Sequence, residues 1–319
     1  MSKLLLGLYQ KMYLIREAEA QIRREYPKDE MKTPMHMSLG EEAIAAGVCQ
    51  ALPANSHLYG TYRSHALYLA WTGETDKFFA ELYGKATGTA GGKAGSMHLA
   101  SPEHGLMATS AVVGTTIPLA LGDAFAARYN NSDHITAVFF GDGAADEGVF
   151  WESLNAACLF QLPILFVCED NDLAIHISKR QRRGYDSLTD IVKNFRCNVF
   201  SGNGNDVEKV YSLALEAVDL IGTRCQPSLL YLTYYRGLEH VGVNKDFDAG
   251  YRSEQESIEW FERDPLTVLK EKICDIYLKE KAADIERVID NQVLESWIRA
   301  RNASFPNPQE LTKGVFHGE

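Results

Sequence analysis

The middle of the chain alternates short apolar runs with amphipathic segments, a pattern typical of a parallel sheet covered by helices. Two runs are nearly all apolar, ITAVFF (135–140) and LPILFVC (162–168), and VFWESLNAACLF (149–160) between them has helical periodicity. RCNVFSGNG (196–204) and SLLYLTYY (228–235) predict two further strands around a helix at 207–222. We therefore expect an α/β fold with a doubly wound, mainly parallel sheet and helices on both faces.

The segments before and after this α/β region have sequence patterns typical of helices. Apolar residues near helical spacing predict an amphipathic helix over 3–26, and residues 32–130 alternate helical stretches (41–52, 75–84 and 117–129) with loops. After residue 251 the chain is charged and rich in helix formers. We expect an N-terminal helix (1–30), an α/β domain (31–252) and a helical C-terminal extension (253–319).

The net charge and the lengths of the apolar runs argue against nucleic acid and membranes as partners. The chain has 32 Lys and Arg against 43 Asp and Glu, a net charge of −11, whereas proteins that bind nucleic acid or anionic membranes usually carry positive charge. No apolar run reaches the roughly 18 residues that span a bilayer, and the first 21 residues become amphipathic too early for a signal peptide. We expect a cytoplasmic protein in which a few placed cations hold any bound phosphate.

Cysteine and glycine usage adds two expectations. The six cysteines are scattered without a C-x-x-C pair, so we expect buried thiols rather than disulfides or a cysteine zinc site. Residues 84–98, GKATGTAGGKAGSMH, are unusually rich in glycine. Such a loop predicts backbone conformations or close approaches that a Cβ atom would forbid.

Candidate chemistry follows two of the predicted strands. Asp142 comes directly after the first apolar run and Asn171 shortly after the second. Ligands of open parallel sheets bind beyond the carboxyl ends of the strands, so both side chains should reach the same edge. Carboxylate and amide oxygens suit Mg²⁺ or Ca²⁺ better than zinc.

Three kinds of phosphate site compete for these residues. A P-loop fails because Thr87 stands where its first glycine is needed and Ala94 replaces the metal-binding Ser or Thr. A dinucleotide-binding turn at 141–146 lacks its third glycine and would place Asp142 against a bare pyrophosphate. In the third alternative, a cation lies between the carboxylate and a diphosphate. GDG followed about 30 residues later by Asn resembles the motif with which thiamine diphosphate enzymes hold Mg²⁺ and their cofactor.

Further motifs extend this resemblance over about residues 9–270. In order they are LYQKMYLIREAE, MHMSLGEEA, YGTYRSHA, GKAGSMH, AVVGTTIPLALG, GDGAADEG, ESLNAA, LPILFVCEDN and TYYRGLEH with GYRS. The chain resembles the α subunits of the decarboxylating first component of 2-oxo acid dehydrogenase complexes, such as pyruvate, branched-chain 2-oxo acid and acetoin dehydrogenases. The resemblance implies a thiamine diphosphate-binding fold over 31–252.

The resemblance implies a role for each matching residue. Asp142, Asn171 and the carbonyl of Leu173 match Mg²⁺ ligands, and Gly141, Gly143 and Ala144 lie on the diphosphate turn. Tyr62, Arg63, Arg236 and His240 match residues at the diphosphate, Ala111 and Val113 match backbone positions at the aminopyrimidine, and His36 matches a histidine near the thiazolium. His36 and His240 are therefore the candidate catalytic residues, while His65 and His98 receive no role.

The same resemblance implies a partner, because the glutamate that activates the cofactor comes from a separate β subunit in this family. We expect an α₂β₂ assembly that decarboxylates a 2-oxo acid and passes the acyl group on, with a lipoyl acyltransferase as one candidate acceptor. A carboligase that uses an aldehyde or ketone acceptor, and a subunit that has lost catalysis, are the alternatives. Val241 stands where mitochondrial relatives carry phosphorylated serines, and Asp146 and Glu147 add acids near the metal turn. With the short N-terminus, these departures favour a divergent bacterial branch.

Overall fold

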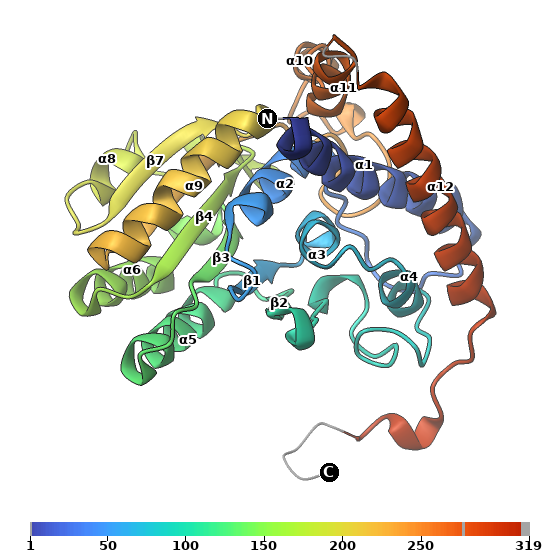
Figure 1. Cartoon of the computed structure of the whole chain (residues 1–319), viewed down its shortest axis with the longest axis horizontal. Helices are drawn as coiled ribbons and strands as arrows, with labels where there is room; N and C mark the ends of the chain where they lie inside the picture. The colour runs from blue at the N-terminus through green and yellow to red at the C-terminus, as the bar shows by residue number, and fades with distance from the viewer. Residues whose placement is uncertain (1, 276–277, 314–319) are drawn as a thin grey trace.

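A six-stranded parallel sheet forms the centre of the protein in the computed structural model, which describes residues 2–275 and 278–313 (Figure 1). The strands lie in the order β2-β1-β3-β4-β8-β7. They are β1 (His57–Thr61), β2 (Leu106–Ser110), β3 (Thr136–Gly141), β4 (Ile164–Asp170), β7 (Asn198–Asn203) and β8 (Ser228–Thr233). A separate antiparallel pair joins β5 (Leu173–Ala174) to β6 (Ile177–Ser178).

Helices cover both faces of the sheet and continue into the C-terminal region. They are α1 (Ser2–Glu25), α2 (Glu42–Ala51), α3 (His65–Thr72), α4 (Asp76–Leu82), α5 (Thr116–Asn130), α6 (Gly148–Phe160), α7 (Lys179–Arg182), α8 (Leu188–Val192), α9 (Val207–Arg224), α10 (Glu254–Phe261), α11 (Pro265–Asp275) and α12 (Lys279–Asn302). Local chemistry sets some of these boundaries: α9 begins after Asp206, whose carboxylate accepts the N–H of Lys209 at 3.0 Å.

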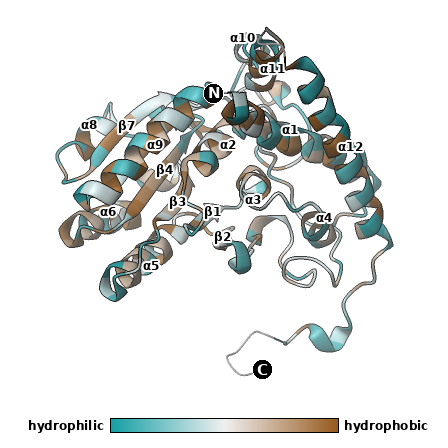
Figure 2. Cartoon of the chain, in the orientation of Figure 1, coloured by the Kyte–Doolittle hydropathy of each residue, from teal (hydrophilic) through white to brown (hydrophobic). Residues whose placement is uncertain are grey.

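The two central strands bury successive side chains on opposite faces of the sheet. On β3, Phe139 packs with α2, α3 and α9, whereas Phe140 packs with α5 and α6. On β4, Val167 lies in the same core cluster as Phe139, and Phe166 lies in the same core cluster as Phe140. Both strands are apolar over most of their length (Figure 2), because neither face meets water, and β4 ends in the acidic residues Glu169 and Asp170. The prediction of a doubly wound sheet with helices on both faces is confirmed.

The C-terminal helices pack against the rest of the molecule. Ile289 and Val293 of α12 belong to the same core cluster as Ile15 of α1, and Trp297 donates a hydrogen bond to the hydroxyl of Tyr83 at 2.9 Å. The helical character of this region is confirmed over the part of 253–319 that the structure describes. The division of the chain at residues 30 and 252 stays a prediction.

Two expectations from composition concern the cysteines and the absence of a membrane-spanning segment. Cys49, Cys158 and Cys168 are buried thiols, but Cys197, Cys225 and Cys274 are only half-buried, so the expectation of burial was wrong for three of the six. All six are free. Among the described residues, no helix is long and apolar enough to cross a bilayer.

The glycine-rich loop wraps around the buried carboxylate of Glu81. Its oxygens accept four backbone N–H groups at 2.7–3.0 Å, those of Ala90, Gly92, Ala94 and Gly95. A Cβ atom on Gly92, where φ is +78°, would lie 2.4 Å from the backbone of Gly84. The predicted need for glycine at close backbone approaches is confirmed here.

Candidate active site

A cavity of about 350 Å³ opens beyond the carboxyl ends of β1, β3, β4 and β8. β3 and β4 run in register, with Gly141 opposite Glu169, so the loops that follow them emerge side by side. Predicted residues make up much of its wall: Tyr62, Arg63, Val113, Gly141, Asp142, Gly143, Ala144, Asn171, Leu173, Arg236 and His240. This size is ordinary for a small-molecule site.

Two predicted residues lie beside the wall rather than in it. Ala111 is the chain neighbour of Ser110 and Val112, which both line the cavity. His36 packs against the rings of Tyr62 and His240, with centroid distances of 4.5 and 5.2 Å. The fold therefore gathers residues from six separate motifs around one cavity.

The predicted metal ligands occupy the edge where β3 and β4 end. Asp142 is almost fully buried, and burial together with the nearby Asp170 raises the pKa of its carboxyl. Asn171 donates from its side-chain amide to the hydroxyl of Tyr234 at 2.9 Å, and its amide oxygen accepts the N–H of Leu173 at 3.0 Å. Hard oxygen donors thus lie at the place that the sequence indicated.

Basic residues that the sequence reasoning missed surround the buried carboxylate of Asp142. Arg182 forms ion pairs with Asp142 and Asp146, and Arg183 lies 2.6 Å from a carboxylate oxygen of Asp146. Arg183 also donates to the backbone carbonyl of Asp142 at 2.8 Å. The signal was the run KRQRR (179–183), which closely follows the loop after β4. Asp146, identified as an extra acid near the turn, is therefore neutralised by this run.

Arg63 presents a buried positive charge at the cavity. It is 7% exposed, and no carboxylate of the described residues lies within 4 Å of its guanidinium nitrogens. It donates instead to the backbone carbonyls of Met37 at 2.7 Å and His240 at 2.9 Å. Since a guanidinium carries five N–H donors, three stay available to an anion in the cavity.

Arg236 approaches from the loop after β8 and is also buried. It donates to the carbonyls of Leu238 and Ile175, both at 3.1 Å, and to the hydroxyl of Tyr251 at 2.6 Å. Ile175 lines the cavity with φ of +57°, a conformation that a β-branched residue rarely adopts. The contact from Arg236 helps hold this strained residue, and strain of this kind gathers at binding sites.

The two candidate catalytic histidines are held neutral near physiological pH. Burial, followed by the charge of Arg63, lowers the pKa of His36 to about 3 and that of His240 to about 4. Nδ1 of His36 is buried without a hydrogen-bond partner. Each imidazole can therefore accept one hydrogen bond and donate another, and His36 has an unused polar atom beside the cavity.

Two buried acids in the cavity wall were not singled out from the sequence. Burial raises the pKa of Glu41 to about 7, and one of its carboxylate oxygens has no hydrogen-bond partner. Burial and the charge of Glu41 also raise the pKa of Glu169. Glu41 falls within the motif MHMSLGEEA, which shows only that this position matches the family. The raised pKa comes from burial, and burial becomes visible only in the folded structure.

The histidines without an assigned role differ in their environments. His65 is fully buried, with Nδ1 2.9 Å from Glu19 and Nε2 2.7 Å from the hydroxyl of Ser96. His98 is exposed. Neither lines the cavity beyond the sheet.

Comparison with known proteins decides the family. The family described as "Dehydrogenase E1 component" matches residues 10–309. The chain belongs to the dehydrogenase E1 component family. It is 31% identical over 313 residues to the α subunit of acetoin:2,6-dichlorophenolindophenol oxidoreductase from Bacillus subtilis, covering 98% of this chain and 93% of that relative. It is 32% identical over 318 residues to the pyruvate dehydrogenase E1 component subunit alpha of Zymomonas mobilis, covering 99% and 89%.

Family membership confirms several expectations. A third relative, the pyruvate dehydrogenase E1 component subunit alpha of Porphyra purpurea, is 32% identical over 321 residues and matches 98% of this chain. The predictions of an E1 α chain and of a thiamine diphosphate-dependent 2-oxo acid dehydrogenase component are confirmed. The E1 family also implies thiamine diphosphate as the cofactor.

Proposed function

We propose that the cavity beyond the sheet holds thiamine diphosphate through Mg²⁺, and that the chain decarboxylates a 2-oxo acid with a β subunit and passes the acyl group on. The observation that supports this most is the pair of buried guanidiniums at the cavity, of which Arg63 has no carboxylate within 4 Å among the described residues. Buried charges require a counter-charge. A diphosphate supplies one.

The residues present fit a magnesium diphosphate. Asp142 and the amide oxygen of Asn171 are hard donors at neighbouring strand ends, and the carbonyl of Leu173 is the proposed third protein ligand. Tyr62, Arg63, Arg236 and His240 would hold the diphosphate, whereas Gly141, Gly143 and Ala144 form the turn beneath it. The backbone at Ala111 and Val113 would bond the aminopyrimidine.

When bound, thiamine diphosphate supplies the nucleophilic carbon that attacks the 2-oxo acid and the ring that stabilises the negative charge left when carbon dioxide departs. The chain's own residues bind and orient. A bound anion would offset the charge of Arg63 that depresses the pKa values of His36 and His240, so binding would raise both. His240 lines the cavity and His36 packs against it, so both imidazoles can donate or accept hydrogen bonds there.

A second subunit is part of this proposal. The relatives compared above are named α subunits, and the cavity is open at Val112 and Val113, which are 63% and 49% exposed. Exposed aromatic residues also gather on α5 and α6, where the rings of Phe125 and Phe160 are 5.6 Å apart. Apolar surface of this kind marks protein interfaces. We propose an α₂β₂ assembly in which the β subunit supplies the activating glutamate.

The fate of the acyl group has two candidates. Relatives named pyruvate dehydrogenase E1 components support transfer within a dehydrogenase complex, with a lipoyl acyltransferase as the candidate acceptor. A carboligase would instead hand the group to an aldehyde or ketone. An assay of the α and β subunits with lipoamide and with an aldehyde as competing acceptors separates the two. The cytoplasmic location stays a prediction.

The binding site is tested by substitution of its proposed metal ligand. Calorimetry of the chain with its β subunit should show thiamine diphosphate binding that requires Mg²⁺ and that Asp142→Ala abolishes. Asp172→Asn is the control, because Asp172 is exposed in the neighbouring loop after β4 and keeps a left-handed conformation that asparagine tolerates. Mg²⁺-dependent binding by Asp142→Ala would show that the metal is misplaced. Absence of such binding in the parent assembly would favour a subunit that has lost catalysis.

A further inference from the structure

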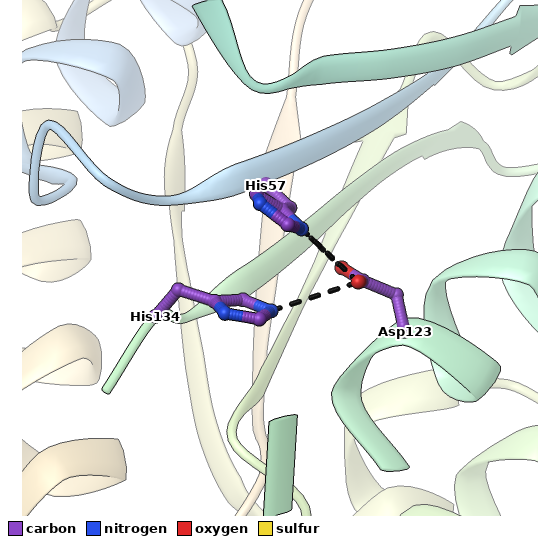
Figure 3. A group of neighbouring side chains, drawn as sticks. All are labelled: His57, Asp123 and His134. Carbon is purple, nitrogen blue, oxygen red and sulfur yellow. Dashed lines mark hydrogen bonds and ion pairs between the residues drawn. The ribbon is translucent and has the colours of Figure 1, made fainter. Parts of the chain in front are cut away.

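A second cluster of potential ligands lies at the opposite end of the sheet from the cavity. His57 is the first residue of β1, His134 lies just before β3, and Asp123 projects from α5 (Figure 3). Since β1 and β3 are neighbouring parallel strands, with His57 opposite Thr136, their amino ends bring the two histidines together. The cofactor site proposed above lies at the carboxyl ends, so the two places are separate.

The three side chains converge on a small space. Nδ1 of His57 is 3.0 Å from both oxygens of Asp123, and Nε2 of His134 is 3.6 Å from one of them. The two imidazole rings stack with centroids 4.0 Å apart. Nε2 of His134 is buried and makes no hydrogen bond. Its separation from Asp123 is longer than a hydrogen bond, so this nitrogen has no partner in the cluster.

Nε2 of His134 lies 3.6 Å from a carboxylate oxygen of Asp123, and no hydrogen bond joins the two. A neutral imidazole that points its lone pair at a carboxylate is repelled unless a cation lies between them. The cluster therefore presents two nitrogens and one carboxylate around a position suited to positive charge.

The spacing suits a metal of the zinc class. Zn²⁺ binds nitrogen and oxygen ligands at about 2.0–2.2 Å, so two ligands of a tetrahedral ion lie about 3.4 Å apart. The distances of 3.0 and 3.6 Å bracket that value. Imidazole ligands select zinc, copper, nickel or cobalt over Mg²⁺. Ligand chemistry thus distinguishes this place from the oxygen-rich cofactor site.

Neighbouring groups orient two of the three side chains, His134 and Asp123, as the outer shell of a metal site would. The hydroxyl of Ser132 is 2.8 Å from Nδ1 of His134, which leaves Nε2 as the coordinating atom. Thr136 donates to the carboxylate of Asp123 at 2.8 Å. Both partners fix ring and carboxylate without occupying the space between them.

We propose that His57, Asp123 and His134 form a binding site for a divalent transition metal of the zinc class, with solvent at the fourth position. The side chain of His57 is 31% exposed and lines a surface cavity, so solvent reaches this side of the cluster. The ion would link β1, α5 and the start of β3. Metal that binds only the folded chain stabilises it by mass action.

The test uses the purified full-length chain, stripped of metal and kept in excess Mg²⁺. Calorimetry with Zn²⁺ should show one site per chain of micromolar affinity or better, and Co²⁺ should give the visible absorption of a tetrahedral complex. His57→Ala and His134→Ala should each weaken binding at least tenfold, whereas the exposed His98→Ala should leave it unchanged. Zn²⁺ should raise the melting temperature of the parent chain but not of His134→Ala.

Three results would overturn the proposal. One is the absence of Zn²⁺ binding by the parent chain, and another is undiminished binding by both histidine variants. The third is loss of Zn²⁺ binding in Asp142→Ala, because the ion would then report the cofactor site. If an alanine variant does not fold, His134→Gln keeps the loop polar and gives the same comparison.

Discussion

The guanidinium of Arg182 forms an ion pair with the carboxylate of Asp142, the residue proposed to bind Mg²⁺. The same guanidinium pairs with Asp146, one turn further along the chain. A buried carboxylate needs positive charge beside it, and here a side chain supplies what we propose a metal supplies in the loaded enzyme. Metal binding then requires Arg182 to move away, and that competition has a measurable cost.

Arg182→Gln should therefore strengthen Mg²⁺ binding. Without the guanidinium, the metal no longer has to displace a cation from Asp142, so we expect the Mg²⁺ concentration for half-maximal thiamine diphosphate binding to fall about three- to tenfold. Calorimetric titration of Mg²⁺ at fixed cofactor measures it. Arg180→Gln is the matched control, since Arg180 is exposed in the same short helix. A higher requirement for Mg²⁺ would mean that Arg182 supports the metal site.

The pH dependence of the free energy of unfolding should show the raised pKa of Glu41. Its pKa is raised to about 7 by burial, so the folded chain holds a proton that the unfolded chain has lost above about pH 4.3. This stabilisation is fully present below that pH and is lost as pH rises through 7. Glu41→Gln lacks it. Relative to the variant, the parent chain should lose about 1 kcal/mol of unfolding free energy between pH 6 and 8.

Urea unfolding of both proteins at pH 6, 7 and 8 measures this difference. His36 and His240 titrate alike in the two proteins, so their effects cancel in the comparison. Glu147→Gln is the control, because Glu147 lines the same cavity but is exposed. Parallel profiles for the parent chain and Glu41→Gln would contradict a raised pKa at Glu41.

The sequence predicted four strands: β3 and β4, which are buried on both faces, and also β7 and β8; it missed β1 and β2. ITAVFF and LPILFVC became β3 and β4. β1 and β2 went unrecognised because each is five residues long, with Gly60 inside β1 and the polar residues Thr109 and Ser110 at the end of β2. α3 and the segment with β5 to α8 were likewise unassigned. Short elements take their stability from neighbours that a local pattern does not contain.

The sequence predicted those residues of the candidate site that lie within recognisable motifs. Asp142 and Asn171 could be paired because both end strands of one β-α-β unit, and the fold brings them to one edge. The pairing of Arg182 with Asp142 spans 40 residues and depends on how the loop after β4 folds back. The cluster of His57, Asp123 and His134 joins three elements at no recognisable spacing. Contacts of this kind are set by topology.

A buried polar network of Glu19, Ser38, His65 and Ser96 should contribute substantially to the free energy of unfolding. Glu19 accepts the N–H of Ser38 at 2.6 Å and lies 2.9 Å from His65, which in turn contacts Ser96. His65→Ala would leave a buried carboxylate short of a partner, which costs about 3–5 kcal/mol. Urea unfolding measures the loss. The exposed His98→Ala should change stability by less than about 0.5 kcal/mol, and a similarly small effect of His65→Ala would show that the network is dispensable.

The order of the glycine-rich loop should depend on Glu81. Its two carboxylate oxygens accept four backbone N–H groups, those of Ala90, Gly92, Ala94 and Gly95. In Glu81→Gln one oxygen becomes an NH₂ group that cannot accept, so about half of these bonds are lost and buried donors face each other. We expect amide hydrogen exchange across 84–98 to accelerate at least tenfold and stability to fall by about 1–3 kcal/mol.

Hydrogen exchange measured by mass spectrometry locates the effect. Glu74→Gln is the control, because Glu74 lies just before the helix that carries Glu81 but accepts no hydrogen bond from this loop. Since the amides concerned are bonded to a single side chain, accelerated exchange should be confined to the loop and should not extend to β3 or β4. Unchanged exchange in Glu81→Gln would mean that the glycine backbone holds its shape without the carboxylate, through its own turns.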